Sequence, residues 1–367
     1  MLKQYKLRNY HFQLILFMVI LTIIGILVIG SAEPSVQKKQ IIGMVLGLVL
    51  MVAVSLIDYS FILKFRWIYY LAVLVLLVLV LFTEETKGAS RWIELGPVTL
   101  QPSELAKLMI ILFFSAYFMK HEESINELKT LVAAFVIVAV PLVLVLKEPD
   151  TSTTILTALI FVTLLFIAGL SYRIVLTVIG ICIPVGIVGI SYILKLAQTG
   201  SDYRFGRIMS WLYPTDPKWS DSAAQQQNSI MAIGSGQLWG KGLNNSVATS
   251  MKNANYIIEP QTDFIFAVAG EELGFAGTLT IMVLLLLIVI ECILIGRKAK
   301  DLSGRLICCG MASLVGFQSF INICVATGLA PNTGIPLPFV SYGLSSLVTL
   351  YIGMGFVLNV GLQPKKY

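Results

Sequence analysis

Long apolar runs separated by short polar stretches make up most of the chain from residue 12 onward. Each run has about 17 to 23 residues, and an α-helix needs about 20 residues to cross the hydrocarbon of a bilayer. The pattern therefore predicts an all-α integral membrane protein in which residues 1–367 form a single polytopic domain. Ten transmembrane helices are expected, at about 12–31, 41–57, 67–83, 103–119, 129–146, 152–170, 174–195, 274–296, 305–326 and 341–361.

The placement of basic residues predicts how these helices are oriented. With the N-terminus in the cytoplasm, both termini lie inside, and fourteen Lys and Arg residues fall in cytoplasmic segments against five in short outer loops. Basic residues in short loops favour the cytoplasmic side, so the bias supports this multi-pass orientation. The net charge of +6 is then a topology signal, and no nucleic-acid partner is expected. Composition agrees, since 57% of the residues are hydrophobic and 13% are charged.

Cysteine and histidine offer no reactive or metal-binding pattern. All five cysteines fall inside apolar runs without a CxxC spacing, which is typical of small core residues. The two histidines, His11 and His121, lie at predicted membrane edges among charged residues. We therefore expect no disulfide, no zinc site and no histidine-based catalytic site.

One long extracytoplasmic loop, residues 198–262, separates the seventh and eighth predicted helices. A structureless loop of about 65 residues is improbable unless it is functional, and this one is neither low in complexity nor strongly charged. Its first part, DYRFGRIMSWLYP, mixes Arg204 and Arg207 with aromatic residues. Such a mixture favours a helix that lies in the headgroup plane.

The glycines around Lys241, in SIMAIGSGQLWGKG, superficially suggest a nucleotide-binding loop. A Walker A sequence needs Gly-x4-Gly-Lys-Ser/Thr, whereas Ser235 stands at the first glycine position and Gly242 follows the lysine. The spacing excludes a nucleotide loop. A cradle of backbone N–H groups and Lys241 for a lipid pyrophosphate stays open.

Three of the four carboxylates in the stretch 255–277, Asp263, Glu271 and Glu272, lie in apolar sequence beside a predicted span. Ionisable groups at a membrane are costly and usually functional. The structural alternative is that Thr262 or Asp263 caps the following helix.

The helix that follows these acids is longer than a membrane requires. One helical pattern of 33 residues runs from Asp263 to about Ile295, which is about 50 Å at 1.5 Å per residue. If Gly274 and Gly277 mark where the spanning part begins, the residues from Asp263 to Glu272 form an acidic rim on the outer side.

A second pair of charges opens the fourth predicted helix. Pro102 fits a first helical position, and Glu104 and Lys107 then lie three residues apart on one face. The pair either neutralises itself as a structural ion pair or faces a polar cavity shared with Asp263. Arg91, beside Trp92, is either an interface anchor or a phosphate ligand.

Two further outer segments carry candidate chemistry. Asp150, followed by TSTT, is a good helix N-cap, and a helix N-terminus there would also favour an anion such as pyrophosphate. The segment 328–346, GLAPNTGIPLPFVSYGLSS, is rich in proline and glycine. Irregular backbone at membrane depth is tolerated inside protein or beside a wet cavity, so this segment is either a cavity wall or a re-entrant structural loop.

Four stretches resemble the SEDS family (shape, elongation, division and sporulation), represented by RodA, FtsW and SpoVE. They are SRWIELGPVTLQPSELAKL, AIGSGQLWGKGLNNS, EPQTDFIFAVAGEELGFAG and NTGIPLPFVSYGLSS, in the family's order and spacing. The resemblance implies a ten-span peptidoglycan glycosyltransferase of the bacterial cytoplasmic membrane that polymerises lipid II at its outer face. Departures from the family's pattern are Gln261, Leu344 and Gln237, none of which removes a charged candidate.

The resemblance also assigns roles to residues. Asp263 of TDFIF looks like the family's essential acid, and Glu104 and Lys107 stand at its SExxK pair. A carboxylate can accept the proton of the attacking GlcNAc 4-OH, so Asp263 is the expected general base. The predicted substrate-binding residues, several of them cations suited to a departing pyrophosphate, are Arg91, Glu104, Lys107, Asp150, Arg204, Arg207, Lys241 and Glu271.

Partners and cofactors follow from the same resemblance. It implies a class B penicillin-binding protein, a single-span transpeptidase, together with lipid II and glycan linked to undecaprenyl pyrophosphate. No cofactor is certain, although a divalent cation, Mg²⁺ or Mn²⁺, could share the pyrophosphate with carboxylates. The alternative functions are a lipid II flippase and a non-catalytic scaffold of the cell-wall machinery. Outer-face clustering of the polar segments and the lack of an internal repeat disfavour a transporter.

Overall fold

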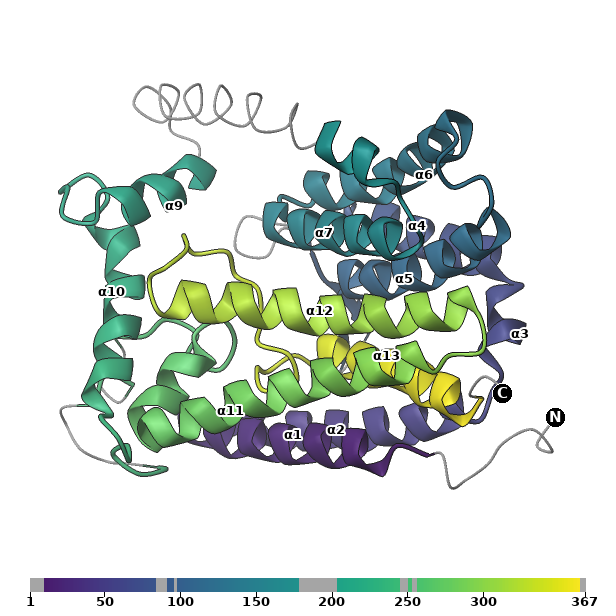
Figure 1. The fold of residues 1–367 in the computed structure, drawn as a ribbon. Coiled ribbons are helices and arrows are strands. Elements are labelled where there is room, and N and C mark those ends of the chain that lie inside the picture. Colours follow the sequence, from purple (N-terminus) through teal and green to yellow (C-terminus); the bar gives the residue numbers. More distant parts are fainter. Residues whose placement is uncertain are drawn as a thin grey trace.

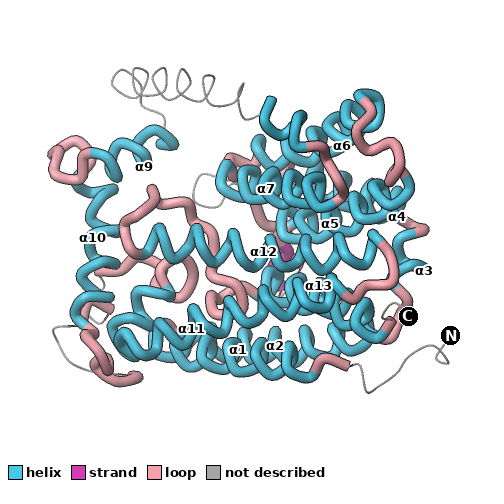
Figure 2. Tube along the Cα trace, viewed as in Figure 1, coloured by secondary structure: helices cyan, strands magenta, loops and turns pink. Residues whose placement is uncertain are grey.

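The computed structural model describes residues 10–83, 91–95, 98–177, 203–244, 250–252 and 256–363. In these ranges the chain is a helical bundle with one short antiparallel hairpin, in which Ile93 pairs with Leu100 (Figures 1 and 2). The elements are α1 Phe12–Ala32, α2 Pro34–Ser55, α3 Tyr59–Leu63, α4 Arg66–Val80, β1 Ile93–Leu95, β2 Val98–Leu100, α5 Pro102–Lys120, α6 Leu128–Lys147, α7 Thr151–Ile167, α9 Tyr203–Leu212, α10 Ser220–Ser235, α11 Ile265–Arg297, α12 Leu302–Ala326 and α13 Leu344–Leu362.

Seven helices of the described residues are long and apolar enough to cross a membrane: α1, α2, α5, α6, α11, α12 and α13. The shorter apolar helices α4 and α7 coincide with the third and sixth predicted spans. A multi-pass helical membrane protein is therefore confirmed, while the count of ten stays a prediction. The seventh predicted span, 174–195, lies almost wholly outside the described residues.

Helix α2 departs from its predicted bounds, because it begins at Pro34 rather than near residue 41. Proline suits the first turn of a helix, where its missing N–H is not needed. The segment from Pro34 to Gln40 is polar, so hydropathy assigns it to a loop although it is helical.

Helices α5 and α13 form the centre of the bundle. Almost every residue of both helices is buried, and α13 packs against α2 and α5. The surrounding helices α1, α2, α4, α6 and α11 alternate buried residues with exposed Leu, Ile, Val and Phe. Exposed apolar side chains on this scale are typical of helices whose solvent is lipid.

The bundle has two dissimilar ends. The terminal end, where α1 begins and α13 finishes, lies near the labelled N- and C-termini in Figure 1, and its connections are short. The loop end is where α5, α7, α11 and α13 begin and α12 finishes. It carries most of the non-helical backbone, and α10 lies across it (Figures 1 and 2).

The polar helix α10 is hydrogen-bonded to the end of α12. The side chains of Gln226 and Ser229 donate to the carbonyl oxygens of Val325 (2.8 Å) and Ala326 (2.7 Å) in the last turn of α12. The last four carbonyls of a helix have no intrahelical partner, so these bonds satisfy groups that would otherwise be buried alone. Hydropathy alone could not predict α10, because its amide-rich sequence has no apolar run.

Helix α11 is not the continuous helix from Asp263 that the sequence suggested. It begins at Ile265, and Gly274 interrupts it with φ 67° and ψ −166°. That conformation is open essentially only to glycine. The interruption at Gly274 agrees with the expectation that this residue marks where the spanning part begins.

Candidate active site

Asp263 lies two residues before α11, in irregular backbone that contacts the segment between α12 and α13. Its carbonyl oxygen accepts a hydrogen bond of 2.9 Å from the side-chain amide of Asn322 on α12. The carboxylate lies against Gly334, where a Cβ atom would be only 3.4 Å from Oδ2. The residue at the N-cap of α11 is Phe264, which makes no side-chain cap, so neither Thr262 nor Asp263 occupies the capping position.

The proline- and glycine-rich segment 328–343 forms one wall of this site. Ser341 Oγ donates to the carbonyl oxygen of Thr262 (2.7 Å), and Tyr342 N donates to that of Gln261 (2.8 Å). Gly334 has φ 69°, in the left-handed region that favours glycine. The segment is thus folded against the residues that carry Asp263, which fits both the cavity wall and the re-entrant structural loop that the sequence left open.

Glu104 and Lys107 form the expected ion pair in the first turns of α5. Lys107 Nζ lies 2.8 Å from Glu104 Oε1, and both side chains are at most 4% exposed. Lys107 also donates to Gln318 Oε1 on α12 (3.1 Å), whose amide nitrogen donates to the carbonyl oxygen of Pro336 (2.9 Å). A buried pair is sustainable when further hydrogen bonds satisfy it, as they do here. The pair therefore reaches the same wall as Asp263.

Sequence reasoning missed Gln318 and Asn322, which join these parts. They are one turn apart on α12, in the stretch GFQSFINICV, and are buried. Two amides spaced i, i+4 in a membrane helix are a signal that could have found them, because buried amides need partners.

A second group of predicted residues, Arg91 and Asp150, surrounds the turn between α6 and α7. The guanidinium of Arg91 donates to the carbonyl oxygens of Glu148 (3.2 Å) and Pro149 (2.5 Å). Asp150 is the N-cap of α7: its Oδ1 accepts from Thr153 N at 3.1 Å and its Oδ2 from Thr153 Oγ1 at 2.9 Å. The capping role is confirmed, while anion binding at this helix stays a prediction.

Glu148, which the sequence analysis did not single out, is the unusual group of this turn. Its side chain is buried, and neither carboxylate oxygen has a hydrogen-bond partner in the described chain. Burial, reinforced by the charge of Asp150 and opposed by that of Arg91, raises the pKa of Glu148 to about 8. A carboxyl in this environment favours its neutral form near neutral pH.

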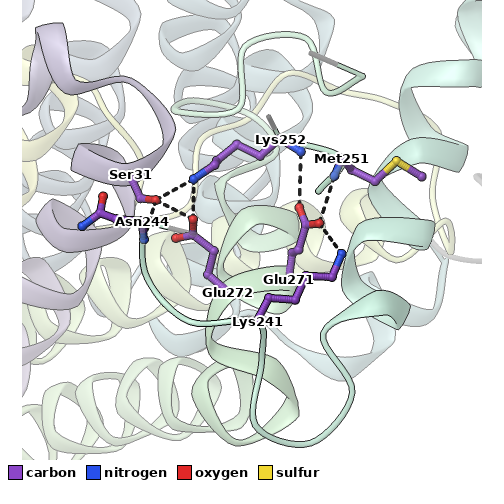
Figure 3. A network of polar contacts seen from close by, with 7 residues as sticks. All are labelled: Ser31, Lys241, Asn244, Met251, Lys252, Glu271 and Glu272. Carbon is purple, nitrogen blue, oxygen red and sulfur yellow. Dashed lines mark hydrogen bonds and ion pairs between the residues drawn. The ribbon is translucent and has the colours of Figure 1, made fainter. Parts of the chain in front are cut away.

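A third group, shown in Figure 3, fastens the long loop to α11. Glu271 accepts from Lys241 Nζ at 2.7 Å and from the backbone N–H groups of Met251 (2.9 Å) and Lys252 (3.3 Å). Three donors thus converge on one fully buried carboxylate. The predicted substrate-binding roles of Lys241 and Glu271 stay predictions, and the structure gives both residues an anchoring role.

The neighbouring carboxylate, Glu272, anchors a different part of the loop. Lys252 Nζ donates to Glu272 Oε1 at 2.5 Å and to Ser31 Oγ, at the end of α1, at 2.7 Å. Ser31 Oγ itself donates to Glu272 and accepts from the backbone N–H of Asn244 (Figure 3). Adjacent acids on α11 therefore tie two loop segments and α1 together.

The segment GSGQLWGKG forms backbone hydrogen bonds with α11 on both sides of its interruption at Gly274. The N–H groups of Phe275 and Ala276 donate to the carbonyls of Gln237 (2.8 Å) and Leu238 (3.1 Å). In return, the N–H groups of Lys241 and Gly242 donate to the carbonyls of Glu271 and Glu272, both at 2.9 Å. The loop supplies partners that the interrupted helix lacks. The N–H groups of Lys241 and Gly242, which belong to the cradle predicted for a pyrophosphate, thus donate hydrogen bonds within the protein.

Close approach explains why this segment is glycine-rich. A Cβ atom on Gly274 would collide with the backbone nitrogen of Gly240, and one on Gly240 with the carbonyl of Glu272. A Cβ on Gly236 would overlap the carbonyl oxygen of Gly270. We call residues 236–242 together with 270–276 the clasp.

Part of the segment that was predicted to lie in the headgroup plane is helical, as α9, which contains Arg204 and Arg207. Trp211 of α9 donates from Nε1 to the carbonyl of Gly328 (2.8 Å), which ties this helix to the wall segment. Arg207 is partly exposed, and the side chain of Arg204 lies outside the described residues. The orientation of α9 in a membrane stays a prediction.

The contacts thus divide the predicted residues into separate groups at the loop end. Asp263, Glu104 and Lys107 meet through α12 and the wall segment. Arg91 and Asp150 share the α6–α7 turn, and Lys241 and Glu271 belong to the clasp. In the described residues no three His, Cys, Asp or Glu side chains converge in a metal-binding group.

The fold and the site define a multi-pass membrane protein that holds an acidic site at one end of its bundle. Residues 6–366 match the family model for FtsW, RodA and SpoVE proteins, described as "Cell cycle protein". The chain belongs to this family, which confirms the resemblance found in the sequence.

Relatives match over nearly the whole chain. It is 32% identical to a probable peptidoglycan glycosyltransferase FtsW of Geobacter metallireducens, covering 98% of this chain and 96% of that protein. It is 33% identical to the peptidoglycan glycosyltransferase MrdB of Escherichia coli strain K12, covering 96% and 93%.

Solved structures agree. A chain from a study of how a peptidoglycan synthase complex coordinates polymerization and crosslinking superposes with a TM-score of 0.79 at 26% identity, covering 96% of this chain and 97% of that chain. The rod shape determining protein RodA of Thermus thermophilus superposes with a TM-score of 0.70 at 26% identity, covering 98% of both chains.

Proposed function

We propose that this chain is a peptidoglycan glycosyltransferase that polymerises lipid II, with Asp263 as the general base. The observation that carries the role of Asp263 is its placement. Its carboxylate lies against Gly334 of the wall segment, and its backbone carbonyl is held by Asn322 of α12. The same wall segment is linked through Gln318 to the buried Glu104–Lys107 pair. The names of the family's relatives support the reaction class.

The reaction assigns a task to each group. The 4-hydroxyl oxygen of the acceptor GlcNAc attacks the anomeric carbon of the lipid-linked chain, and the new carbon–oxygen bond replaces the bond to pyrophosphate. Asp263 accepts the hydroxyl proton, which lowers the barrier when the carboxylate is within hydrogen-bond reach. The lipid pyrophosphate leaves with the bonding electron pair.

Cations at the loop end would stabilise the departing pyrophosphate. The candidates are Arg91, Lys107, Arg204, Arg207 and Lys241, and positive groups preorganised in a dry site are effective stabilisers of developing negative charge. Lys107 is the best placed, because its contacts reach the same wall as Asp263. A divalent cation, Mg²⁺ or Mn²⁺, would take most of its ligands from pyrophosphate oxygens, since the described protein groups offer no three-ligand cluster.

The loop end would face the outside of the bacterial cytoplasmic membrane. The excess of Lys and Arg in the segments at the terminal end supports this orientation, with both termini in the cytoplasm. Lipid II presented at the outer leaflet could then reach Asp263. A class B penicillin-binding protein is the proposed partner, supported by the similarity to a chain of a peptidoglycan synthase complex.

Polymerisation of lipid II in liposomes, with the cognate transpeptidase added, tests this proposal. We expect glycan strands from the native chain and a loss of at least about 100-fold in Asp263→Asn and Asp263→Ala. The matched control is Asp301→Asn, an acid that caps α12 at the terminal end and should leave the rate per folded molecule unchanged.

Other outcomes would replace the proposal. Undiminished polymerisation by both Asp263 variants would move the search for the base to Glu104 or Glu271. Transport of lipid II across the bilayer without polymer would favour the flippase. Normal cell-wall growth supported by Asp263→Ala, with surface changes on the helices abolishing it, would favour the scaffold.

A further inference from the structure

Two buried amides, Gln318 and Asn322, lie one turn apart on α12, and Asn322 bonds the backbone of the proposed catalytic residue. Their side chains are at most 1% exposed. A polar group in an apolar helix is costly unless its hydrogen bonds are made. Four hydrogen bonds from this amide pair reach residues of the proposed active site, and none of the four stays within α12.

Asn322 joins two segments with a single nitrogen. Its Nδ2 donates to the carbonyl oxygen of Asp263 (2.9 Å) and to that of Ile335 (2.8 Å). Because both acceptors are carbonyls, only the NH₂ side of the amide can face them, which fixes the orientation of the side chain. The distance between the Asp263 backbone and the wall is therefore set from α12.

Gln318 performs the same task one turn away. Its Oε1 accepts from Lys107 Nζ and its Nε2 donates to the carbonyl of Pro336, the residue after Ile335. Lys107 of α5 and the backbone of Asp263 are thus linked, through Gln318 and Asn322, to adjacent residues of the wall segment. Helix α12 is the element common to both.

Asp263 needs this support because it lies outside the helix. It precedes the first residue of α11 by two positions, so the helical ladder does not fix its peptide. The side-chain amide of Asn322 supplies a bond to that peptide instead. A reacting group must be held within about 0.5 Å of its productive position, and an error of about 1 Å can cost 100-fold in rate.

We propose that Asn322 is a positioning residue for glycosyl transfer: by bonding the carbonyls of Asp263 and Ile335 it aims the Asp263 carboxylate at the acceptor hydroxyl, as Gln318 aims Lys107. The inference rests on the proposed function. It adds that α12, which supplies neither the base nor the cation, determines how the two face each other.

The test uses the full-length chain with its partner in liposomes and compares Asn322→Leu with the native protein. Leucine keeps the volume and introduces no buried charge, but leaves both carbonyls without this donor. We expect kcat for lipid II polymerisation, normalised to folded protein, to fall about 10- to 100-fold while KM changes less than about 2-fold. A role in folding alone would lower the folded fraction and leave the normalised kcat unchanged.

Asn359→Leu is the matched control. Asn359 is also a fully buried asparagine that bridges backbone groups, because Nδ2 donates to Ser55 O (2.7 Å) and Oδ1 accepts from Tyr59 N (2.9 Å). It lies near the terminal end, so its loss should lower thermal stability without altering the normalised kcat. An equal fall of kcat in both variants would overturn the proposal.

Two further outcomes complete the test. A native kcat in folded Asn322→Leu would show that Asn322 positions nothing. If that variant does not fold, Asn322→Ser, which retains one donor, decides between a lowered kcat and a native one. Asp263→Asn is run alongside: full activity in that variant would refute the proposed base, whereas an inactive Asp263→Asn with a native Asn322→Leu would refute the positioning role alone.

Discussion

The two segments of α11 show how differently one helix can be stabilised. Between Ile265 and Glu272 every residue is buried, two carboxylates included, and hydrogen bonds from the loop surround them. Beyond Gly274 the same helix alternates buried residues such as Ile281 and Ile288 with exposed ones such as Leu286. The first segment is thus built like the interior of a protein, and the second like a helix in lipid.

The difference shows which segment of α11 depends on particular residues. The lipid-facing segment requires only apolar side chains on its exposed face, and many sequences satisfy that requirement. The first segment requires particular partners at particular distances, because each buried charge must be paired. The interruption at Gly274 separates the segment with paired buried charges from the segment with exposed apolar side chains.

Replacing Gly274 itself should have the largest effect. In Gly274→Ala the Cβ atom would collide with Gly240 and Leu238, and the backbone would have to adopt a conformation that costs about 1–3 kcal/mol for a side-chain-bearing residue. We expect little folded protein after extraction, measured by size-exclusion profiles on heating. Gly316→Ala in α12, where the nearest atom to the new Cβ is 3.7 Å away, should be neutral; equal loss in both would contradict the clasp.

Carboxylates from the two segments provide the next comparison. Glu271→Ala removes the buried acceptor shared by Lys241 and two backbone N–H groups, and breaking a buried ion pair costs about 3–5 kcal/mol. Glu291 of the second segment lies 3.7 Å from His11, and both side chains are partly exposed, so Glu291→Ala should cost at most about 1 kcal/mol. Melting temperatures in detergent will distinguish the two, and similar decreases would refute the contrast.

Glu148, whose carboxylate has no hydrogen-bond partner among the described residues, should lower stability when ionised, whereas the paired carboxylates raise it. The pKa of Glu148 is raised to about 8 from an ordinary value of 4.5, so the folded protein binds more protons than the unfolded chain between these values. The contribution of Glu148 to the free energy of unfolding is fully present below about pH 4.5 and is lost as pH rises toward 8. The loss amounts to at most roughly 1.4 kcal/mol for each unit by which the two pKa values differ. Glu148→Gln should therefore melt higher than the native protein at pH 8, with a smaller gain at pH 5. A gain that is the same at both pH values would contradict this environment.

The smallest effect is expected from the lipid-facing surface. Leu286 is 57% exposed, and on a membrane-spanning helix an exposed apolar side chain faces lipid. Leu286→Ala should shift the melting temperature by no more than about 2 °C. A decrease comparable with that of Glu271→Ala would mean that the second segment is packed more specifically than we infer.

Hydropathy predicted the spanning helices well because each one is a local property of the sequence. The positions of α1, α5, α6 and α12 follow from runs of apolar residues, and those of the Glu104–Lys107 pair and the Asp150 cap follow from spacing within one turn. Helix α10 and the early start of α2 were not predictable in this way, since their sequences are polar.

What the sequence could not give is contact between distant segments. Gly274 was noticed, but the loop that completes its backbone hydrogen bonds is more than thirty residues away, and the glycines of 236–242 looked like a phosphate site. Asp263 was found through its charge and resemblance, yet its tether to Asn322, 59 residues later, was not. Such pairings depend on how helices approach one another, which hydropathy does not encode.

The pH dependence of lipid II polymerisation tests the central claim, that Asp263 accepts the proton, most directly. For the native chain we predict that log(kcat/KM) rises with unit slope at acidic pH and then levels, because only the ionised carboxylate can act as base. The residual activity of Asp263→Asn should lack this acidic limb. An unchanged limb in Asp263→Asn would contradict the account and assign the proton to another group.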